Sequence, residues 1–151
     1  MRVLCDTNVL ARAATRPDGP AQELIRRLLT SDNHVLVVTP FVLDELVRVL
    51  GYTRVRLRSV ASTEEIARFL DGLEQACELV EAPTSTLQSV PGDPDDDPVL
   101  TGAMHGRVDV LCTRDRHFHA SDVVALCARF KIRILDDVAL LAELRQAESA
   151  E

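Results

Sequence analysis

The 151-residue sequence has little of what marks several common classes of protein. Aromatic residues make up 3% of it, four Phe and one Tyr, so a base-stacking platform for single-stranded nucleic acid is not expected. No apolar run approaches the roughly 20 residues of a membrane span. The apolar start of the chain meets an acid at Asp6, which leaves no secretory h-region. These absences predict a soluble, cytoplasmic protein without a membrane partner.

The cysteines do not form a metal-binding or redox motif. There is no C-x-x-C pair among Cys5, Cys77, Cys112 and Cys127, and a zinc site needs closer ligand spacing. Three of the four lie in apolar stretches. We therefore expect free thiols that pack as small hydrophobic side chains.

Lysine is nearly absent, because 16 of the 17 basic residues are Arg and only Lys131 is Lys. The formal net charge is −7, which argues against a surface built for non-specific nucleic-acid binding. A nuclease is not excluded, since acids that hold a metal ion make the formal charge more negative. Arginine also suits bidentate contacts with phosphate.

Short apolar runs alternate with longer amphipathic ones, which predicts an α/β domain. Strands are expected at 2–5, 34–39, 78–81, 109–113 and 132–135, and helices at 20–30, 40–50, 62–77, 98–106 and 137–147. The pattern favours one domain over 1–151 with a mainly parallel sheet of about five strands flanked by helices, and a frayed tail at 146–151. Ligands of such sheets bind beyond the carboxyl ends of the strands.

Three acidic residues fall where that edge is expected. Asp6 ends the first strand, and Asp115 follows the fourth in "LCTRD". Each has an alternative role as a turn residue that caps the next helix. Glu45 lies at the rim of the apolar stripe of helix 40–50, where it has solvent or Arg48 as alternative partners.

The run "DPDDDPVL" at 93–100 holds four more acids. Asp97 before Pro98 has the pattern of a helix N-cap followed by a first-turn proline. A calcium loop starting at Asp93 would need Gly and Glu where the chain has Pro98 and Met104, so that hypothesis fails. Acids from separate segments at one sheet edge instead predict an all-oxygen site for Mg²⁺ or Mn²⁺, which can drive phosphodiester hydrolysis without a protein nucleophile.

Four segments in order resemble the PIN-domain family, in particular the toxin component of prokaryotic type II toxin–antitoxin systems. They are "MRVLCDTNVL", "LDELVRVL", "DPDDDPVLTGA" and "VLCTRDRHF". The resemblance implies a metal-dependent endoribonuclease that leaves a 5′-phosphate, is inhibited by a cognate antitoxin and often forms a homodimer. Some PIN-like domains have lost their activity, so an inactive binding module remains an alternative.

The resemblance also implies the site residues. The catalytic acids would be Asp6, Glu45, Asp96 and Asp115, the metal ligands these four and Asp97, and the supporting residues Thr7, Asn8 and Thr113. Two registers fit the third acid: Asp96 has Ala103 seven residues later, and Asp97 has Asp115 eighteen residues later. We favour Asp96, because Asp97 is the better helix cap.

Basic residues follow the Glu45 helix in "RVLGYTRVRLRS". Arg48, Arg54, Arg56 and Arg58 are candidates for guiding RNA phosphates, with a solvated basic surface or an antitoxin contact as alternatives. His117 and His119 are expected in surface or capping roles.

Two other enzyme or signalling classes place acids at such an edge. A receiver domain needs an acidic pair after the first strand and a lysine after a late strand, whereas this chain has Asp6 alone and Lys131 before its strand. A haloacid-dehalogenase-like phosphatase needs a second Asp where the chain has Asn8.

Overall fold

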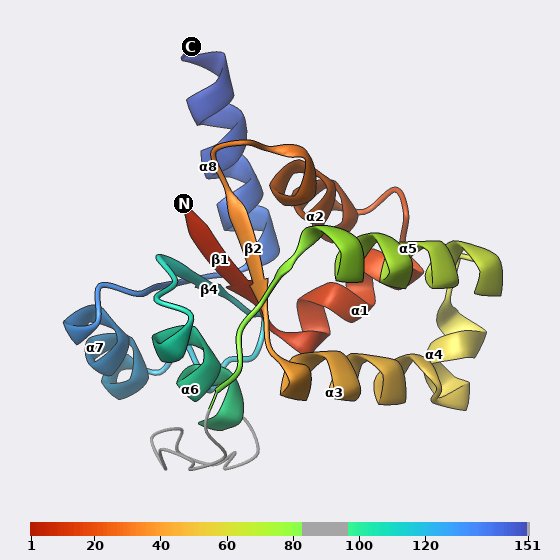
Figure 1. The fold of residues 1–151 in the computed structure, drawn as a ribbon, viewed down its shortest axis with the longest axis horizontal. Helices are drawn as coiled ribbons and strands as arrows, with labels where there is room; N and C mark the ends of the chain where they lie inside the picture. The colour runs from red at the N-terminus through yellow and green to blue at the C-terminus, as the bar shows by residue number, and fades with distance from the viewer. Residues whose placement is uncertain (83–96, 151) are drawn as a thin grey trace.

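The computed structural model describes residues 1–82 and 97–150 (Figure 1). Its described strands form one sheet of five parallel strands, in the order β3-β2-β1-β4-β5. They are β1 (Arg2–Cys5), β2 (Val35–Val38), β3 (Glu78–Leu79), β4 (Val110–Cys112) and β5 (Arg133–Leu135). β1, β2 and β4 are almost wholly buried runs of apolar residues, as strands covered on both faces must be.

This confirms the predicted α/β class and the parallel sheet. The strand order differs from the 2-1-3-4-5 order of receiver-type sheets, so the receiver hypothesis is wrong. β3 is shorter than the predicted strand at 78–81, because it lies at the edge of the sheet and pairs with β2 alone.

The described residues form eight helices. They are α1 (Thr7–Thr15), α2 (Pro20–Thr30), α3 (Pro40–Leu50), α4 (Thr53–Arg58), α5 (Thr63–Ala76), α6 (Asp97–His105), α7 (Ser121–Arg129) and α8 (Asp137–Ser149). In Figure 1, α6 and α7 lie to one side of the strands, and α1, α3, α4 and α5 to the other. None of these helices is long and apolar enough to cross a membrane.

Local sequence explains where several helices begin. The Thr39 hydroxyl accepts a hydrogen bond from the Val42 amide at the start of α3, and Pro40 occupies the first helical position. Ser62 and Glu65 form the predicted capping box of α5. α6 begins at Asp97 itself, one residue earlier than predicted, so Asp97 is not the residue before the helix.

Three helices escaped prediction. α1 and α7 have nine residues each and α4 has six, so their apolar stripes are short, and none of them has the Asp-Pro start that marked the equally short α6. The predicted roles of the cysteines are confirmed, because all four are free and only Cys77 is not fully buried.

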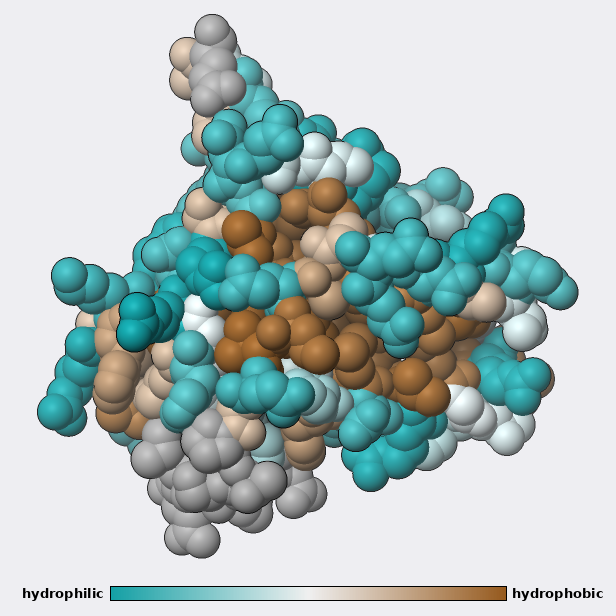
Figure 2. Space-filling view, in the orientation of Figure 1, coloured by the Kyte–Doolittle hydropathy of each residue, from teal (hydrophilic) through white to brown (hydrophobic). Residues whose placement is uncertain are grey.

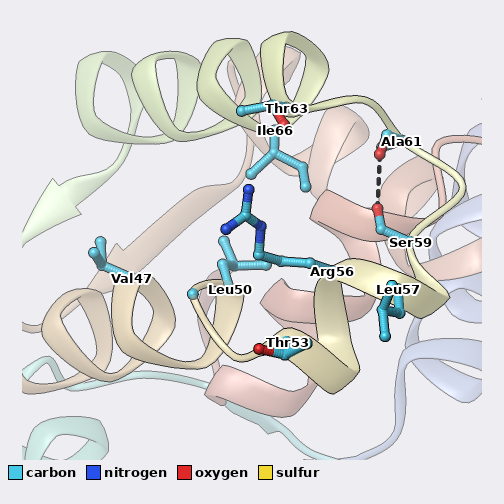
Figure 3. Close-up of a pocket in the computed structure, with 10 residues that line it drawn as sticks. Val47, Leu50, Thr53, Arg56, Leu57, Ser59, Ala61, Thr63 and Ile66 are labelled. Atoms are coloured by element: carbon cyan, nitrogen blue, oxygen red, sulfur yellow. Dashed lines mark hydrogen bonds between the residues drawn. The ribbon is translucent and has the colours of Figure 1, made fainter.

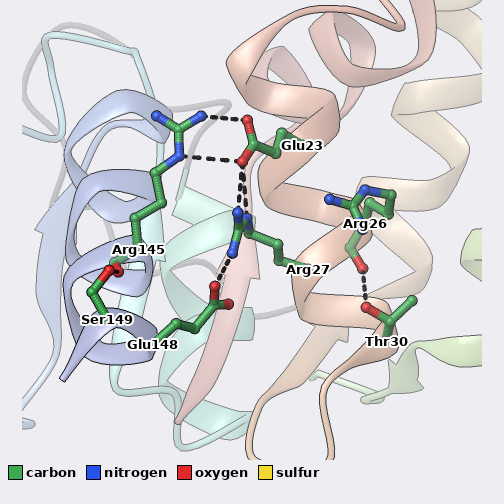
Figure 4. Close-up of polar contacts among 7 residues, drawn as sticks. All are labelled: Glu23, Arg26, Arg27, Thr30, Arg145, Glu148 and Ser149. Atoms are coloured by element: carbon green, nitrogen blue, oxygen red, sulfur yellow. Dashed lines mark hydrogen bonds and ion pairs between the residues drawn. The ribbon is translucent and has the colours of Figure 1, made fainter. Parts of the chain in front are cut away.

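The C-terminal helix is longer and better anchored than predicted. α8 continues to Ser149, two residues beyond the helix end predicted at 147. Glu23 of α2 accepts hydrogen bonds from Arg27 and Arg145, and Arg27 also pairs with Glu148 (Figure 4). We call Glu23, Arg27, Arg145 and Glu148 the α2–α8 clamp. It joins two helices that pack against each other along their apolar faces.

Close packing also sets the position of α6. A Cβ atom added at Gly102 would lie 2.7 Å from Thr39 Cγ2, so a larger residue there would push α6 away from the start of α3. Gly102 therefore holds the helix that begins in the acidic run against the helix that carries Glu45.

Candidate functional site

The candidate site lies at the topological switch point of the sheet. β1 connects to β2 on one side and pairs with β4 on the other, and clefts in such sheets open where the strand order reverses. Asp6 directly follows β1, and Thr113 directly follows β4. The Asp6 amide donates to the Cys112 carbonyl at 2.9 Å, so the sheet is ordered up to the site.

Asp6 is the buried centre of the site, with 3% of its surface exposed. Its Oδ1 accepts a hydrogen bond from the Thr7 amide at 2.7 Å. Its Oδ2 accepts from Asn8 Nδ2 at 2.9 Å and from Thr113 Oγ1 at 2.8 Å. Asp6 also caps α1, so the expected capping role and a central position in the site coexist in one side chain.

The pKa of Asp6 is raised from 3.8 to about 6. Burial is the largest cause, because a charged carboxylate loses its hydration there. Hydrogen bonds from Thr113 and Thr7 act in the opposite direction, and the charges of Glu45 and Asp115 raise the pKa further. Glu45 and Asp115 are therefore each close enough to Asp6 to repel its charge.

Glu45 is joined to Asp6 through Thr7. The Thr7 hydroxyl donates to Glu45 Oε2 at 2.5 Å, while the Thr7 amide donates to Asp6. The side chain of Glu45 is 25% exposed, and its Oε1 lies 3.7 Å from Arg48 Nη2. The Glu45 carboxylate thus contacts both Thr7, which links it to Asp6, and Arg48, which the sequence offered as its alternative partner.

Asp115 is joined to Asp6 through Thr113. The Thr113 hydroxyl donates to Asp6 and accepts a hydrogen bond from the Asp115 amide at 3.1 Å. Asp115 Oδ1 accepts from the His117 amide at 2.9 Å and lies 3.1 Å from His117 Nδ1. His119 Nε2 lies 2.9 Å from the Thr113 carbonyl, a local contact of the kind expected for these histidines.

The donor set suits a hard divalent cation in its chemistry. All three side chains offer carboxylate oxygens, and a cation would offset both the burial that chiefly raises the Asp6 pKa and the repulsion from Glu45 and Asp115 that adds to it. Within the described residues, however, no three His, Cys, Asp or Glu side chains are grouped as a metal-binding cluster. The predicted third acid, Asp96, lies outside the described residues, and of Asp97 only the backbone is described.

One contact of the site was missed by sequence reasoning. Asp137, the first residue of α8, is completely buried and accepts a hydrogen bond from Arg114 Nη1 at 3.0 Å. The Arg114 amide donates to Asn8 Oδ1 at 3.2 Å, so Arg114 fixes the segment between Thr113 and Asp115 at both its backbone and its side chain. A signal was present, because Asp136 directly follows β5 and caps α8, as Asp6 follows β1 and caps α1, and Asp137 is the next residue.

The four predicted RNA-binding arginines separate in space. Arg48 lies beside Glu45. Arg54 and Arg58 line a small cavity between α1 and α4, whereas Arg56 points to the opposite side of α4.

Arg56 lies in a groove of about 560 Å³ between α3, α4 and α5. Figure 2 shows apolar surface running between α3 and α5. In Figure 3 the Arg56 side chain extends between Leu50 and Ile66, with Val47 on the α3 wall. Leu57, which also lines the groove, is 81% exposed.

Residues 2–117 match the sequence profile described as PIN domain. The chain belongs to the PIN-domain family. PIN domains are generally nucleases. The acidic residues at the strand ends of this sheet are consistent with membership of that family. Residues 118–150 of this PIN domain add α7, β5 and α8 beyond the matched segment.

The fold of this PIN domain is similar to a chain in the crystal structure of VapBC2 from Rickettsia felis bound to a DNA fragment from their promoter. The TM-score is 0.56 at 14% sequence identity, and the alignment covers 90% of this chain and 98% of that one. At that identity the likeness concerns the fold alone. No curated protein matches the sequence.

Proposed function

We propose that this PIN domain is the toxin of a toxin–antitoxin pair and acts in the cytoplasm as a Mg²⁺- or Mn²⁺-dependent endoribonuclease. The observation that carries the proposal is that the buried Asp6 carboxylate is linked to Glu45 through the amide and hydroxyl of Thr7, and to the backbone of Asp115 through the hydroxyl of Thr113. A protein seldom keeps a buried carboxylate beside two others unless a cation is to be held there.

In this proposal Asp6, Glu45 and Asp115, together with Asp96 or Asp97, hold the cation. When bound, it would lower the pKa of a water molecule and stabilise charge on the phosphodiester. Thr7 orients the carboxylates of Asp6 and Glu45 through its amide and its hydroxyl, respectively. The Thr113 hydroxyl orients the Asp6 carboxylate and anchors the backbone of Asp115. Asn8 keeps Asp6 Oδ2 and the Arg114 amide in register.

The proposed antitoxin would bind the groove between α3, α4 and α5. The structural neighbour VapBC2 is an assembly bound to its own promoter, as expected for a toxin–antitoxin pair. Apolar walls with Arg56 among them suit an amphipathic segment that carries one acidic residue. Leu57→Asp should then weaken capture of the antitoxin at least about tenfold, while a loss of homodimer alone would assign the groove to a second copy.

The decisive experiment measures RNA degradation by the purified protein with Mg²⁺, with Mn²⁺ and with chelator. Cleavage should require the metal and should disappear in Asp6→Asn, whose circular dichroism spectrum stays that of the wild type. Cleavage that survives the chelator, or an Asp6→Asn variant as active as the wild type, would rule out the metal mechanism.

A cellular experiment separates a toxin from an inactive binding module. Overproduction of the wild type should halt growth, Asp6→Asn should not, and co-expression of the small neighbouring gene product should restore growth. Equal growth arrest by both forms would show that binding, and not cleavage, is the activity.

A further inference from the structure

A second charged site lies apart from the acids, between α1 and α4. Four arginines line a cavity of about 290 Å³: Arg12 and Arg16 from the end of α1, and Arg54 and Arg58 from α4. We call these four side chains the arginine pocket. Its remaining described lining residues are Ala11, Thr15 and Val55, none of which is acidic.

The guanidinium groups of the arginine pocket have few ion-pair or hydrogen-bond partners among the described residues. Among the described residues no ion pair joins any of its four guanidinium groups to a carboxylate. Arg12 Nε is buried and has no hydrogen-bond partner within the described part of the chain. Like charges that converge in a protein with a net charge of −7 repel one another unless an anion joins them.

One wall of the pocket is preorganised. The guanidinium carbon of Arg54 lies 5.7 Å from the centroid of the Tyr52 ring, a cation–π contact that holds its direction. Arg54 and Arg58 are four residues apart on α4 and therefore face the same side, whereas Arg56 faces the apolar groove. Two planar guanidinium groups on the same side of α4 suit bidentate hydrogen bonds with phosphate oxygens.

The pocket lies on the same side of α1 as the acids. Thr7 contacts Glu45, and the residues four and eight positions later on that face, Ala11 and Thr15, line the pocket. Asn8 contacts Asp6, and the residues four and eight positions later are Arg12 and Arg16. At about 1.5 Å per residue, these arginines follow Asn8 by about 6 and 12 Å along the helix.

We propose that the arginine pocket is a phosphate subsite that binds the RNA backbone a few nucleotides away from the acids. This inference rests on the proposed ribonuclease function and adds to it the residues that position the strand. Backbone contacts of this kind fix register without reading sequence. They also attract the RNA polyanion, which the carboxylates of the acid site repel.

The test measures binding of a short fluorescein-labelled single-stranded RNA by fluorescence anisotropy, with chelator present so that the RNA stays intact. Arg54→Gln/Arg58→Gln should weaken binding about tenfold or more at ~0.1 M salt. The slope of log affinity against log salt should fall by about 0.7 for each phosphate that the variant no longer binds. Arg26→Gln/Arg129→Gln removes the same charge from two exposed positions outside the pocket and is the matched control.

The two proposals fail in different ways. If the wild type never cleaves RNA, but the pocket variant binds RNA more weakly and the control variant does not, the nuclease proposal is wrong and the phosphate subsite is supported. Equal losses in the pocket variant and the control would overturn the subsite, because only net charge would then matter. A pocket variant that loses affinity for polyglutamate but not for the RNA would also overturn it and would assign the arginines to an acidic protein.

Discussion

The α2–α8 clamp and the acid site use charge in opposite ways. In the clamp, acids and arginines alternate at the surface, and hydrogen bonds from Arg145 and Arg27 hold the pKa of Glu23 below its usual value. In the acid site, Asp6 is buried near two other carboxylates, and its pKa is raised to about 6. The clamp is complete in itself, whereas the acid site lacks a positive partner at its centre within the described residues.

The comparison separates charges that pair within the fold from charges that the proposed function assigns to a ligand. Paired charges at a surface add little stability, because solvent screens them and ordering long side chains costs entropy. A buried carboxylate such as Asp6, which forms no ion pair among the described residues, costs stability and is tolerated where a bound ion or substrate offsets the cost. Removing a charge should therefore have opposite consequences in the two regions.

The largest effect is expected from the acids. Glu45→Gln and Asp115→Asn should each reduce RNA cleavage at least about a thousandfold in initial-rate assays, because each removes a charge that would hold the metal. Asp44→Asn is the control, since Asp44 lies beside Glu45 on α3 and makes no described contact with Asp6. Activity retained in Glu45→Gln would remove this residue from the site.

A smaller loss is expected from the hydroxyl that links Asp6 to Asp115. Thr113→Val should reduce cleavage about 10- to 100-fold, because Asp6 loses a hydrogen bond that orients its carboxylate and Asp115 loses an anchor of its backbone, while both keep their charge. Thr113→Ser keeps the hydroxyl and should restore most of the rate, and Thr30→Val at an exposed position should have no effect. If Thr113→Val cleaves RNA as fast as the wild type, the Thr113 hydroxyl is not needed for cleavage and the residue serves only in packing.

Asp6→Asn should stabilise the metal-free protein. The folded pKa of about 6 lies above the ordinary 3.8, so ionisation of Asp6 opposes folding as the pH rises through this interval, and the full penalty persists above it. Two pKa units correspond to about 3 kcal/mol, and the loss of a hydrogen bond leaves a net gain of about 1–2 kcal/mol. Thermal denaturation at pH 8 with chelator should show a Tm about 2–6 °C higher.

The same comparison at pH 4 provides the control, because Asp6 is then almost fully protonated in the folded state and partly protonated in the unfolded state, so most of the ionisation penalty is absent and the advantage of the variant should shrink. A variant that melts well below the wild type at pH 8 would mean that the hydrogen bonds to Asp6, and not its charge, dominate the energetics of the site.

The smallest effect is expected from the clamp. Arg27→Ala should lower the Tm by no more than about 2 °C, since its partners are surface carboxylates, and added salt should shrink the difference. A loss comparable with that of a core substitution would show that the clamp carries the docking of α8. Circular dichroism melts at low and high salt measure both quantities.

Strong, repeated patterns made most of the fold predictable. Continuous apolar runs identified the central strands, and the Ser62–Glu65 capping box identified the start of α5. The short helices α1, α4 and α7 were missed, because a stripe of two turns is no stronger than chance. The end of α8 was missed because the contact between Arg27 and Glu148 joins residues far apart in the sequence.

The site was predictable only in part, for a physical reason. Asp6 and Asp115 follow strands, and topology alone brings such residues to one edge. Asp137 also follows a strand, but its buried pairing with Arg114 depends on how α8 docks. The arginine pocket combines α1 with α4, two helices that the sequence did not reveal, so only Arg54 and Arg58 were recognised as candidates.

The measurement that tests the central claim most directly is thermal denaturation of the wild type and of Asp6→Asn with and without Mn²⁺ at pH 8. Without metal, Asp6→Asn should melt above the wild type. With Mn²⁺, the wild type should gain several degrees and Asp6→Asn almost none, because the Asn amide cannot replace the Asp6 carboxylate as a ligand of the ion. No change of the wild-type Tm at any Mn²⁺ concentration that leaves the protein soluble would contradict a metal site at this sheet edge.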